Sequence, residues 1–238
     1  MPALCLPLRR RPDAGSGQSL HLASTPKTQR YASRLHKMNV IVFFAVLAFS
    51  LQMRNSLEQR RRVLFLGRYL RRYQIESLMQ SLVDGYLRAM GEQDMDRRQS
   101  IWSMLTQTEA QLYEQFQSLL TDLEDANPRG LRASTLPLSL PLATRWLPGA
   151  TFNLREVLVV HGDGIARMLN NTAGLAERDR SYCMVAELLL MQHSCHWFCK
   201  SRWIASARML ARHKTSHDQL LEAVSAPTRS AYRKIMGI

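Results

Sequence analysis

The side chains best suited to metal chemistry gather in the segment QHSCHWFCK, which holds His193, Cys195, His196 and Cys199. On a helix, Cys195 and Cys199 would lie one turn apart, with His196 within a turn of Cys199. Thiolates and imidazoles so placed could bind one zinc or copper ion. Structural zinc sites usually draw ligand pairs from turns, however, and small thiols are common on buried helix faces. We therefore favour core packing and predict neither a metal nor another cofactor.

A second group of candidate residues lies in the basic C-terminal region. Residues 200–238 hold 8 Lys/Arg against 2 Asp/Glu, and Arg208, Arg212 and Lys214 precede a short turn between two predicted helices. A helix-turn-helix with these cations could contact nucleic-acid phosphates. No distinctive glycine marks the turn. A nucleic-acid-binding regulator is therefore our alternative prediction, and a solvated or lipid-facing basic surface ranks above it.

The familiar signatures of enzymes are missing from the sequence, which has no phosphate loop, nucleophile elbow, HExxH motif or dinucleotide fingerprint. The segment REVLVVHGDGIARML loosely resembles the strand, His, Gly, helix element of histidine phosphatases. That resemblance would imply an Arg-His-Gly with a nucleophilic histidine, and the chain contains none. We therefore predict no catalytic residue and no enzymatic activity.

The run Met38–Met53 is the only long stretch without a charged residue. As a helix its sixteen residues rise about 24 Å, slightly less than a hydrocarbon core of about 30 Å. Lys37 and Arg54 bracket the run with stems long enough to reach the membrane interface. We predict a transmembrane helix over 38–53; a buried core helix is the alternative, and a cleaved signal peptide is less favoured.

The residues before this run have no apolar period and combine several prolines with Arg9, Arg10 and Arg11. We predict that residues 1–37 form a disordered basic tail. Met38 stands directly before the apolar run and is a possible alternative start of the chain.

Residues 54–125 are predicted to form a juxtamembrane amphipathic hairpin of two helices, Val63–Met90 and Arg97–Asp125. Glycine and aspartate after Met90 give the expected stop and cap. The first helix carries arginines suited to anionic lipid headgroups: Arg60, Arg61, Arg62, Arg68, Arg71 and Arg72. An ordinary bundle helix with a solvated arginine face explains them equally well, and the acidic second helix could lie against them.

Four prolines within residues 126–150 predict an extended linker that divides the region after the span in two. We expect its leucines and Trp146 to pack against another part of the protein. Residues 151–238 are predicted to form a C-terminal helical domain, with one long helix from Ala176 to about Lys214 and two short helices after it. For residues 154–162 both helix and strand remain open, and we favour helix.

Charge is distributed in a basic, acidic, basic order, with net charges of +12, −7 and +8 over residues 1–75, 76–127 and 128–238. Four clustered or isolated cysteines are too few for a disulfide framework, so free thiols in a reducing cytosol are expected. Together these features predict an all-α, single-span protein of a bacterial inner membrane, with its C-terminal bulk in the cytoplasm. We expect an adaptor, assembly or regulatory component that contacts anionic lipids and an unknown protein partner, and a homo-oligomer is a further option.

Overall fold

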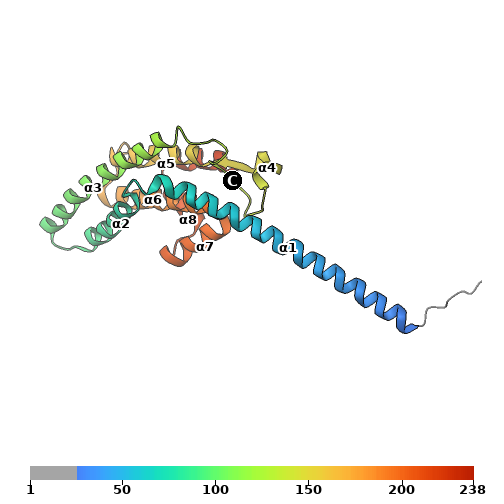
Figure 1. Ribbon diagram of the computed structural model, residues 1–238. Helices are drawn as coiled ribbons and strands as arrows, with labels where there is room; N and C mark the ends of the chain where they lie inside the picture. Colours follow the sequence, from blue (N-terminus) through green and yellow to red (C-terminus); the bar gives the residue numbers. More distant parts are fainter. Residues whose placement is uncertain (1–25) are drawn as a thin grey trace, which may run out of the picture. The chain divides into compact units, whose positions relative to one another are not determined.

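The computed structural model describes residues 26–238, and the side chains of residues 36–238. Within this part of the chain the structure is almost entirely helical, which confirms the predicted all-α class (Figure 1). Two compact units meet within the first helix, between Ala48 and Phe49. The elements are α1 (Pro26–Leu70), α2 (Ile75–Gly91), α3 (Met95–Asp122), β1 (Arg132–Ser134), α4 (Ala143–Trp146), η1 (Pro148–Ala150), β2 (Thr151–Asn153), α5 (Leu154–Leu169), α6 (Glu177–Cys199), α7 (Arg202–His213), α8 (His217–Ala223) and α9 (Ala226–Met236).

The first helix, α1, is 45 residues long and contains the whole apolar run. By length and composition α1 can cross a membrane from His36 onward, and no residue of its most apolar window is buried. Because α1 begins at Pro26, residues 26–37 are helical, and the prediction that they belong to a disordered tail is wrong. Proline is tolerated in a first helical turn, and good helix formers follow it. Residues 1–25 lie outside the described part, so the prediction for them is untested.

A break after Leu70 separates α1 from α2, where we predicted one helix over Val63–Met90. Arg72 and Tyr73 close the last turn of α1 through short-range bonds to the carbonyls of Tyr69 and Leu70. The next backbone N–H, that of Gln74, is bound 2.6 Å away by the side chain of Gln115 on α3. A tertiary contact therefore stabilises a turn that no glycine or proline marks.

Helices α2 and α3 form the predicted antiparallel hairpin, and its turn follows Gly91 as expected. The Asp94 carboxylate caps α3 by accepting bonds from the N–H groups of Asp96 and Arg97. The two helices approach closely at Gly85, where an added Cβ would lie 2.3 Å from a methyl of Leu105. Glycine at this position is what allows the hairpin to close.

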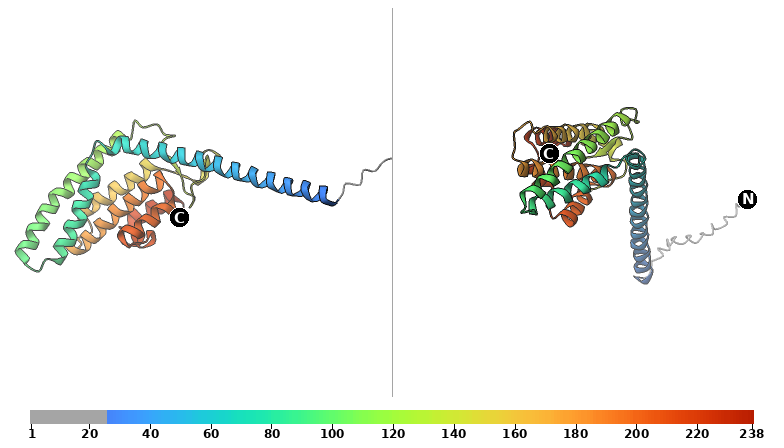
Figure 2. Two further views of the ribbon diagram at one scale, coloured as in Figure 1. Left: turned by 60° about the horizontal axis from the view of Figure 1, so that its bottom comes forward. Right: turned by 90° about the vertical axis from the view of Figure 1, so that its left-hand side faces the viewer.

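The region predicted as a linker is structured. Strands β1 and β2 pair antiparallel with Ala133 opposite Phe152, and the short helices α4 and η1 lie between them. Residues 49–238 form one compact unit, so the predicted division at residues 126–150 is wrong. The physical reason is the core, which α3 shares with α5 and α2 shares with α6 (Figure 2). Neither half could bury its apolar stripe alone.

The C-terminal part packs as helices around α6. Residues 154–162 are helical and belong to α5, whose N-terminus is capped by the Asn153 side chain. The predicted helix over 176–214 is instead two helices, because Lys200 leaves helical geometry and Ser201 caps α7 at Ile204 N–H. The capping box of Ser216 and Gln219 at α8 is present as predicted.

Candidate functional site

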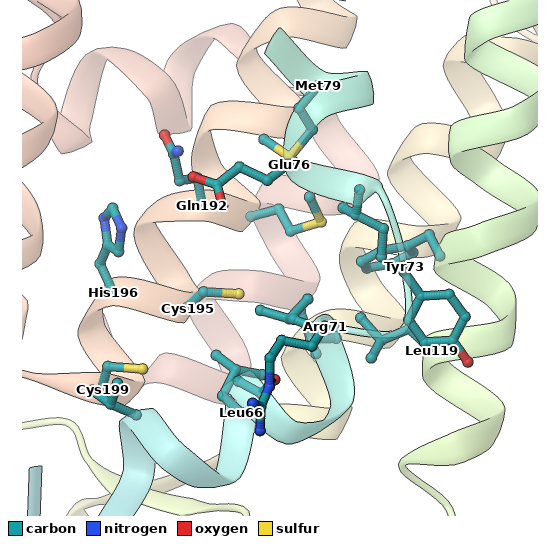
Figure 3. A pocket seen from close by; sticks show the side chains of 17 residues that line it. Leu66, Arg71, Tyr73, Glu76, Met79, Leu119, Gln192, Cys195, His196 and Cys199 are labelled. Atoms are coloured by element: carbon teal, nitrogen blue, oxygen red, sulfur yellow. The ribbon is translucent and has the colours of Figure 1, made fainter. Parts of the chain in front are cut away.

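A cleft of about 460 Å³ lies between the end of α1, the start of α2 and one face of α6 (Figure 3). Its floor is apolar and includes Leu66, Met79 and Leu119. Aliphatic side chains of this kind exclude water and favour an apolar occupant. The cleft is thus a place where an apolar side chain or small apolar group could bind.

Polar side chains line this cleft at only a few places. Arg71 is held in position by a bond of 3.1 Å from its Nε to the carbonyl of Gly67. Tyr73, Glu76, Gln192 and His196 are further polar members of the lining. Burial, helped by the nearby Arg208, lowers the pKa of His196 below its ordinary value. The imidazole is therefore neutral at pH 7, and the cleft offers an arginine and a glutamate to orient a polar end.

Two free thiols, Cys195 and Cys199, also line the cleft. Burial raises the pKa of the Cys195 thiol to about 12 and that of Cys199 to about 11. The thiolate is the reactive and metal-binding form of cysteine, and at pH 7 almost none of it would be present here. These side chains are suited to packing rather than to nucleophilic chemistry.

The structure separates the four residues considered for a metal site. Cys195, His196 and Cys199 lie on the cleft side of α6, whereas His193 stacks on His217 with ring centroids 4.4 Å apart. Within the described chain no group of three or more His, Cys, Asp or Glu side chains is placed to hold a metal. His193 and Cys195 are two residues apart on the helix, and residues at this spacing do not face each other.

His193 belongs to a buried polar cluster to which α5, α6, α7, α8 and α9 contribute side chains. Its Nε2 lies 3.0 Å from Ser206 Oγ, and His217 Nε2 lies 3.4 Å from Tyr232 OH. His161 Nε2 lies 2.9 Å from Ser194 Oγ. This cluster of His161, His193 and His217 with their hydroxyl partners is called the histidine core below.

Burial dominates the electrostatics of the histidine core. It lowers the pKa of His161 to about 3, and burial together with the neighbouring His217 lowers that of His193 to about 2. Burial and the charge of Arg202 lower the pKa of His217 to about 4. All three imidazoles are therefore neutral at pH 7, because burial outweighs the opposing charge of Asp218, which lies 3.8 Å from His217 Nδ1.

A buried carboxylate, Glu187, lies beside the histidine core on α6. It accepts bonds of 3.2 and 3.0 Å from the N–H and hydroxyl of Ser225. An added Cβ at Gly164 would lie 2.4 Å from Glu187 Oε2, so glycine lets α5 pass over the carboxylate. Burial raises the pKa of Glu187 above its usual range. The contacts tie α5, α6 and the start of α9 together.

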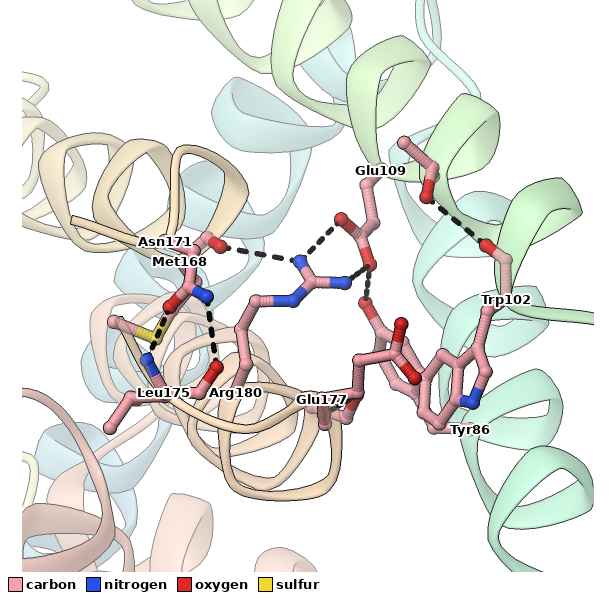
Figure 4. Close-up of polar contacts among 10 residues, drawn as sticks. Tyr86, Trp102, Glu109, Met168, Asn171, Leu175, Glu177 and Arg180 are labelled. Carbon is pink, nitrogen blue, oxygen red and sulfur yellow. Dashed lines mark hydrogen bonds and ion pairs between the residues drawn. The ribbon is translucent and has the colours of Figure 1, made fainter. Parts of the chain in front are cut away.

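The second buried charge is an ion pair that links the hairpin to α6 (Figure 4). Arg180 donates to both oxygens of Glu109 at 2.7 and 3.0 Å, and Tyr86 OH donates to the same carboxylate at 2.5 Å. The carboxylate of Glu109 is 1% exposed. This group was not predicted from the sequence, since Glu109 reads as one more polar position of an amphipathic helix. The spacing of Glu109 places it in register with the apolar stripe of α3, and this register was the sequence signal for its burial.

Comparisons with known proteins identify no relative. The chain matches no protein-family model, no curated protein and no solved structure. Its function must therefore be inferred from its own residues.

The arginines predicted to contact lipid headgroups are not equivalent. Arg60, Arg61 and Arg68 are exposed on α1. Arg62 is half-buried and lies 3.9 Å from Glu58, and desolvation lowers its pKa below its usual range. The remaining two, Arg71 and Arg72, are exposed but bonded to the carbonyl of Gly67 and to Asp122 respectively. Three of the six are thus fully available to a membrane surface.

The arginines predicted for nucleic acid are exposed on α7, with Lys214 in the turn after it. The following helix, α8, has only seven residues and buries three of them in the core. Its exposed positions include Asp218 and Glu222, which repel phosphates. The two helices therefore lack the long basic recognition helix that a helix-turn-helix places in the major groove.

Proposed function

We propose that this chain is a single-span membrane protein whose helical region binds a protein partner, as an adaptor, assembly or regulatory component. The observation that carries the proposal is the contrast between two apolar surfaces. The later part of the chain buries a continuous core, whereas the apolar side chains of the run 38–53 are exposed, for example Phe43 at 64% and Phe49 at 69%. A bilayer is the ordinary environment for a helix of this kind.

The proposed orientation places the C-terminal bulk in the cytoplasm. Four basic residues precede the apolar run closely, whereas seven arginines follow it: Arg54, Arg60, Arg61, Arg62, Arg68, Arg71 and Arg72. An excess of Lys and Arg favours retention of that flank on the inner side. We propose that this membrane is the bacterial inner membrane.

Expression of the full chain with a reporter fused after Ile238 tests anchoring and orientation together. We expect the fusion to stay in the membrane fraction after an alkaline carbonate wash, because only integral segments resist that treatment. We also expect a reporter that is active only in the periplasm to stay inactive and a cytoplasmic reporter to be active. Release into the soluble fraction would refute the anchor, and periplasmic activity would reverse the orientation.

Protein binding is supported by the tip of the α2–α3 hairpin. Apolar side chains stand in solvent there, including Leu87 at 62%, Met95 at 69% and Met104 at 71% exposure. Methionine is flexible and polarisable, and is often used on surfaces that bind protein partners. A catalytic arrangement is not apparent in the cleft or the histidine core, so binding is the activity we propose.

Photo-cross-linking in intact cells tests this surface. We expect a photoreactive residue at Met95 or Met104 to give a discrete protein adduct, since a docked partner would cover these side chains. Gln111 is exposed on the same helix and provides the matched control position, at which we expect no such adduct. Equal labelling at all three positions would mean that the hairpin tip is ordinary solvated surface.

A further inference from the structure

The segment between β1 and β2 exposes apolar side chains that we expected to be packed. Leu138 is 59% exposed, Leu140 51%, Trp146 71% and Leu147 47%. We propose that residues 136–150, called the collar, lie in the headgroup layer of the membrane that α1 crosses. The inference rests on the proposed membrane anchor and adds a second, separate membrane contact to it.

Two hydrogen bonds hold the collar against α1. Ser139 Oγ donates to Asn55 Oδ1 at 2.6 Å, and the N–H of Leu142 donates to Glu58 Oε1 at 3.0 Å. Both α1 residues follow closely on Met53, the last residue of the apolar run. The collar is therefore fixed to the part of α1 that leaves the hydrocarbon.

The depth of the collar follows from helix geometry. A run of about 24 Å falls about 6 Å short of the hydrocarbon thickness, so a centred helix would keep the hydrocarbon boundary about 3 Å beyond Met53. At about 1.5 Å per residue this boundary lies near Asn55. The headgroup layer is about 5–8 Å thick and would extend from there to about Gln59 or Arg60. Asn55 and Glu58, which hold the collar, both lie inside that interval.

The chemistry of the collar suits this layer. Tryptophan is enriched at membrane interfaces, where its ring is apolar and its N–H remains hydrated. A second tryptophan, Trp203 at the start of α7, is 67% exposed and donates its backbone N–H to the carbonyl of Pro137 at 3.1 Å. Leucines 138 and 140 on either side of Ser139 add apolar contact area.

Charge complementarity argues for an anionic bilayer rather than another surface. A hollow of about 270 Å³ adjoins the collar at Thr144 and is lined by Arg61, Arg62, Arg129 and Arg132, with Glu58 as its only acid. Arg61, Arg129 and Arg132 are exposed. Cations beside an anionic leaflet favour binding to it. Exposed tryptophan, leucine and arginine side chains near one another are the composition of a membrane-contacting surface.

The test uses full-length protein reconstituted in vesicles of anionic and zwitterionic lipid, with lipids brominated on the acyl chain near the headgroup as the quencher. Two tryptophans, Trp102 and Trp197, are buried, whereas Trp146 and Trp203 are exposed. We expect brominated lipid to quench part of the native emission. That part should disappear in the double variant Trp146→Phe, Trp203→Phe, which leaves the core unaltered.

A tryptophan introduced by Met95→Trp into the double variant provides the matched control, and it should not be quenched. Carbonate extraction of the same vesicles separates the two proposals. Protein that resists extraction while its Trp146 and Trp203 escape quenching would keep the anchor and overturn the collar, leaving this face for a protein partner. Protein that is extracted would overturn the anchor and the collar together.

Discussion

The Arg180→Ala variant will lose about 3–5 kcal/mol of unfolding free energy. The carboxylate of Glu109 is 1% exposed and would be left buried without its cation. Among the described residues, Tyr86 OH is the only other donor to this carboxylate, and one neutral donor cannot replace a bidentate guanidinium. Denaturant unfolding of the detergent-solubilised protein, followed by circular dichroism at neutral pH, measures the loss.

The matched control is Arg72→Ala, which breaks an exposed ion pair with Asp122 at 2.9 Å. We expect that variant to lose no more than about 1 kcal/mol, since solvent screens the pair. Replacing the whole buried group by apolar residues, with Glu109→Leu, Arg180→Met and Tyr86→Phe, should restore most of the stability. Equal losses of unfolding free energy in the two arginine variants would show that the buried ion pair contributes no more to stability than the exposed one.

Acidification from pH 7 to pH 5 will lower the free energy of unfolding by about 6 kcal/mol through the histidine core alone. In the unfolded chain each histidine has a pKa of about 6.5, whereas in the fold the pKa values are about 3 for His161, 2 for His193 and 4 for His217. Between about pH 6.5 and 4 the unfolded state therefore binds more protons, and stability falls as pH falls. At pH 5 each group contributes about 2 kcal/mol to the loss.

The slope of stability against pH is the most direct measurement of this effect. Three histidines give about 4 kcal/mol per pH unit near pH 5, against a total stability of about 5–15 kcal/mol for a typical domain. The variant His161→Gln keeps a polar partner for Ser194 and should reduce the slope by about a third. The raised pKa of Glu187 has the opposite effect, because it makes the fold more stable as pH falls. It is one group acting against three histidines. A slope unchanged by His161→Gln would contradict the assignment.

Helix periodicity and capping residues were reliable guides along most of this chain. The apolar spacing before Gly91, the cap at Asp94 and the box of Ser216 and Gln219 each act over a few residues, so the sequence alone predicts them. The helical choice for residues 154–162 also agrees with the structure. These are local properties, and local chemistry determines them.

The predicted element boundaries were mostly wrong where contacts with distant segments determine the local structure. The turn after Leu70 depends on the Gln115 side chain of α3, and no neighbour in sequence announces it. The break at Ser201 did carry a local signal, because serine is a favoured N-cap, but the continuous apolar pattern on both sides masked it. The proline-rich segment reads as a linker until its strands are seen to pair.

The candidate site could be predicted only in part. Cys195, His196 and Cys199 do lie together in the cleft, as their helical spacing implies. The cleft itself also needs Leu66 of α1 and Met79 of α2, which depend on how three helices assemble. The register of Glu109 with the apolar stripe indicates its burial, but its pairing with Arg180 could not be predicted, since pairing across helices has no periodic signature.

The 71-residue separation between Glu109 and Arg180 also affects how the protein is made. A ribosome adding about 5–20 residues each second needs about 4–14 s to cover that distance. During this interval the nascent hairpin carries a carboxylate and an apolar stripe whose partners have not yet been synthesised. The emerging chain would therefore depend on a chaperone or on the nearby bilayer to shield it until α6 is complete.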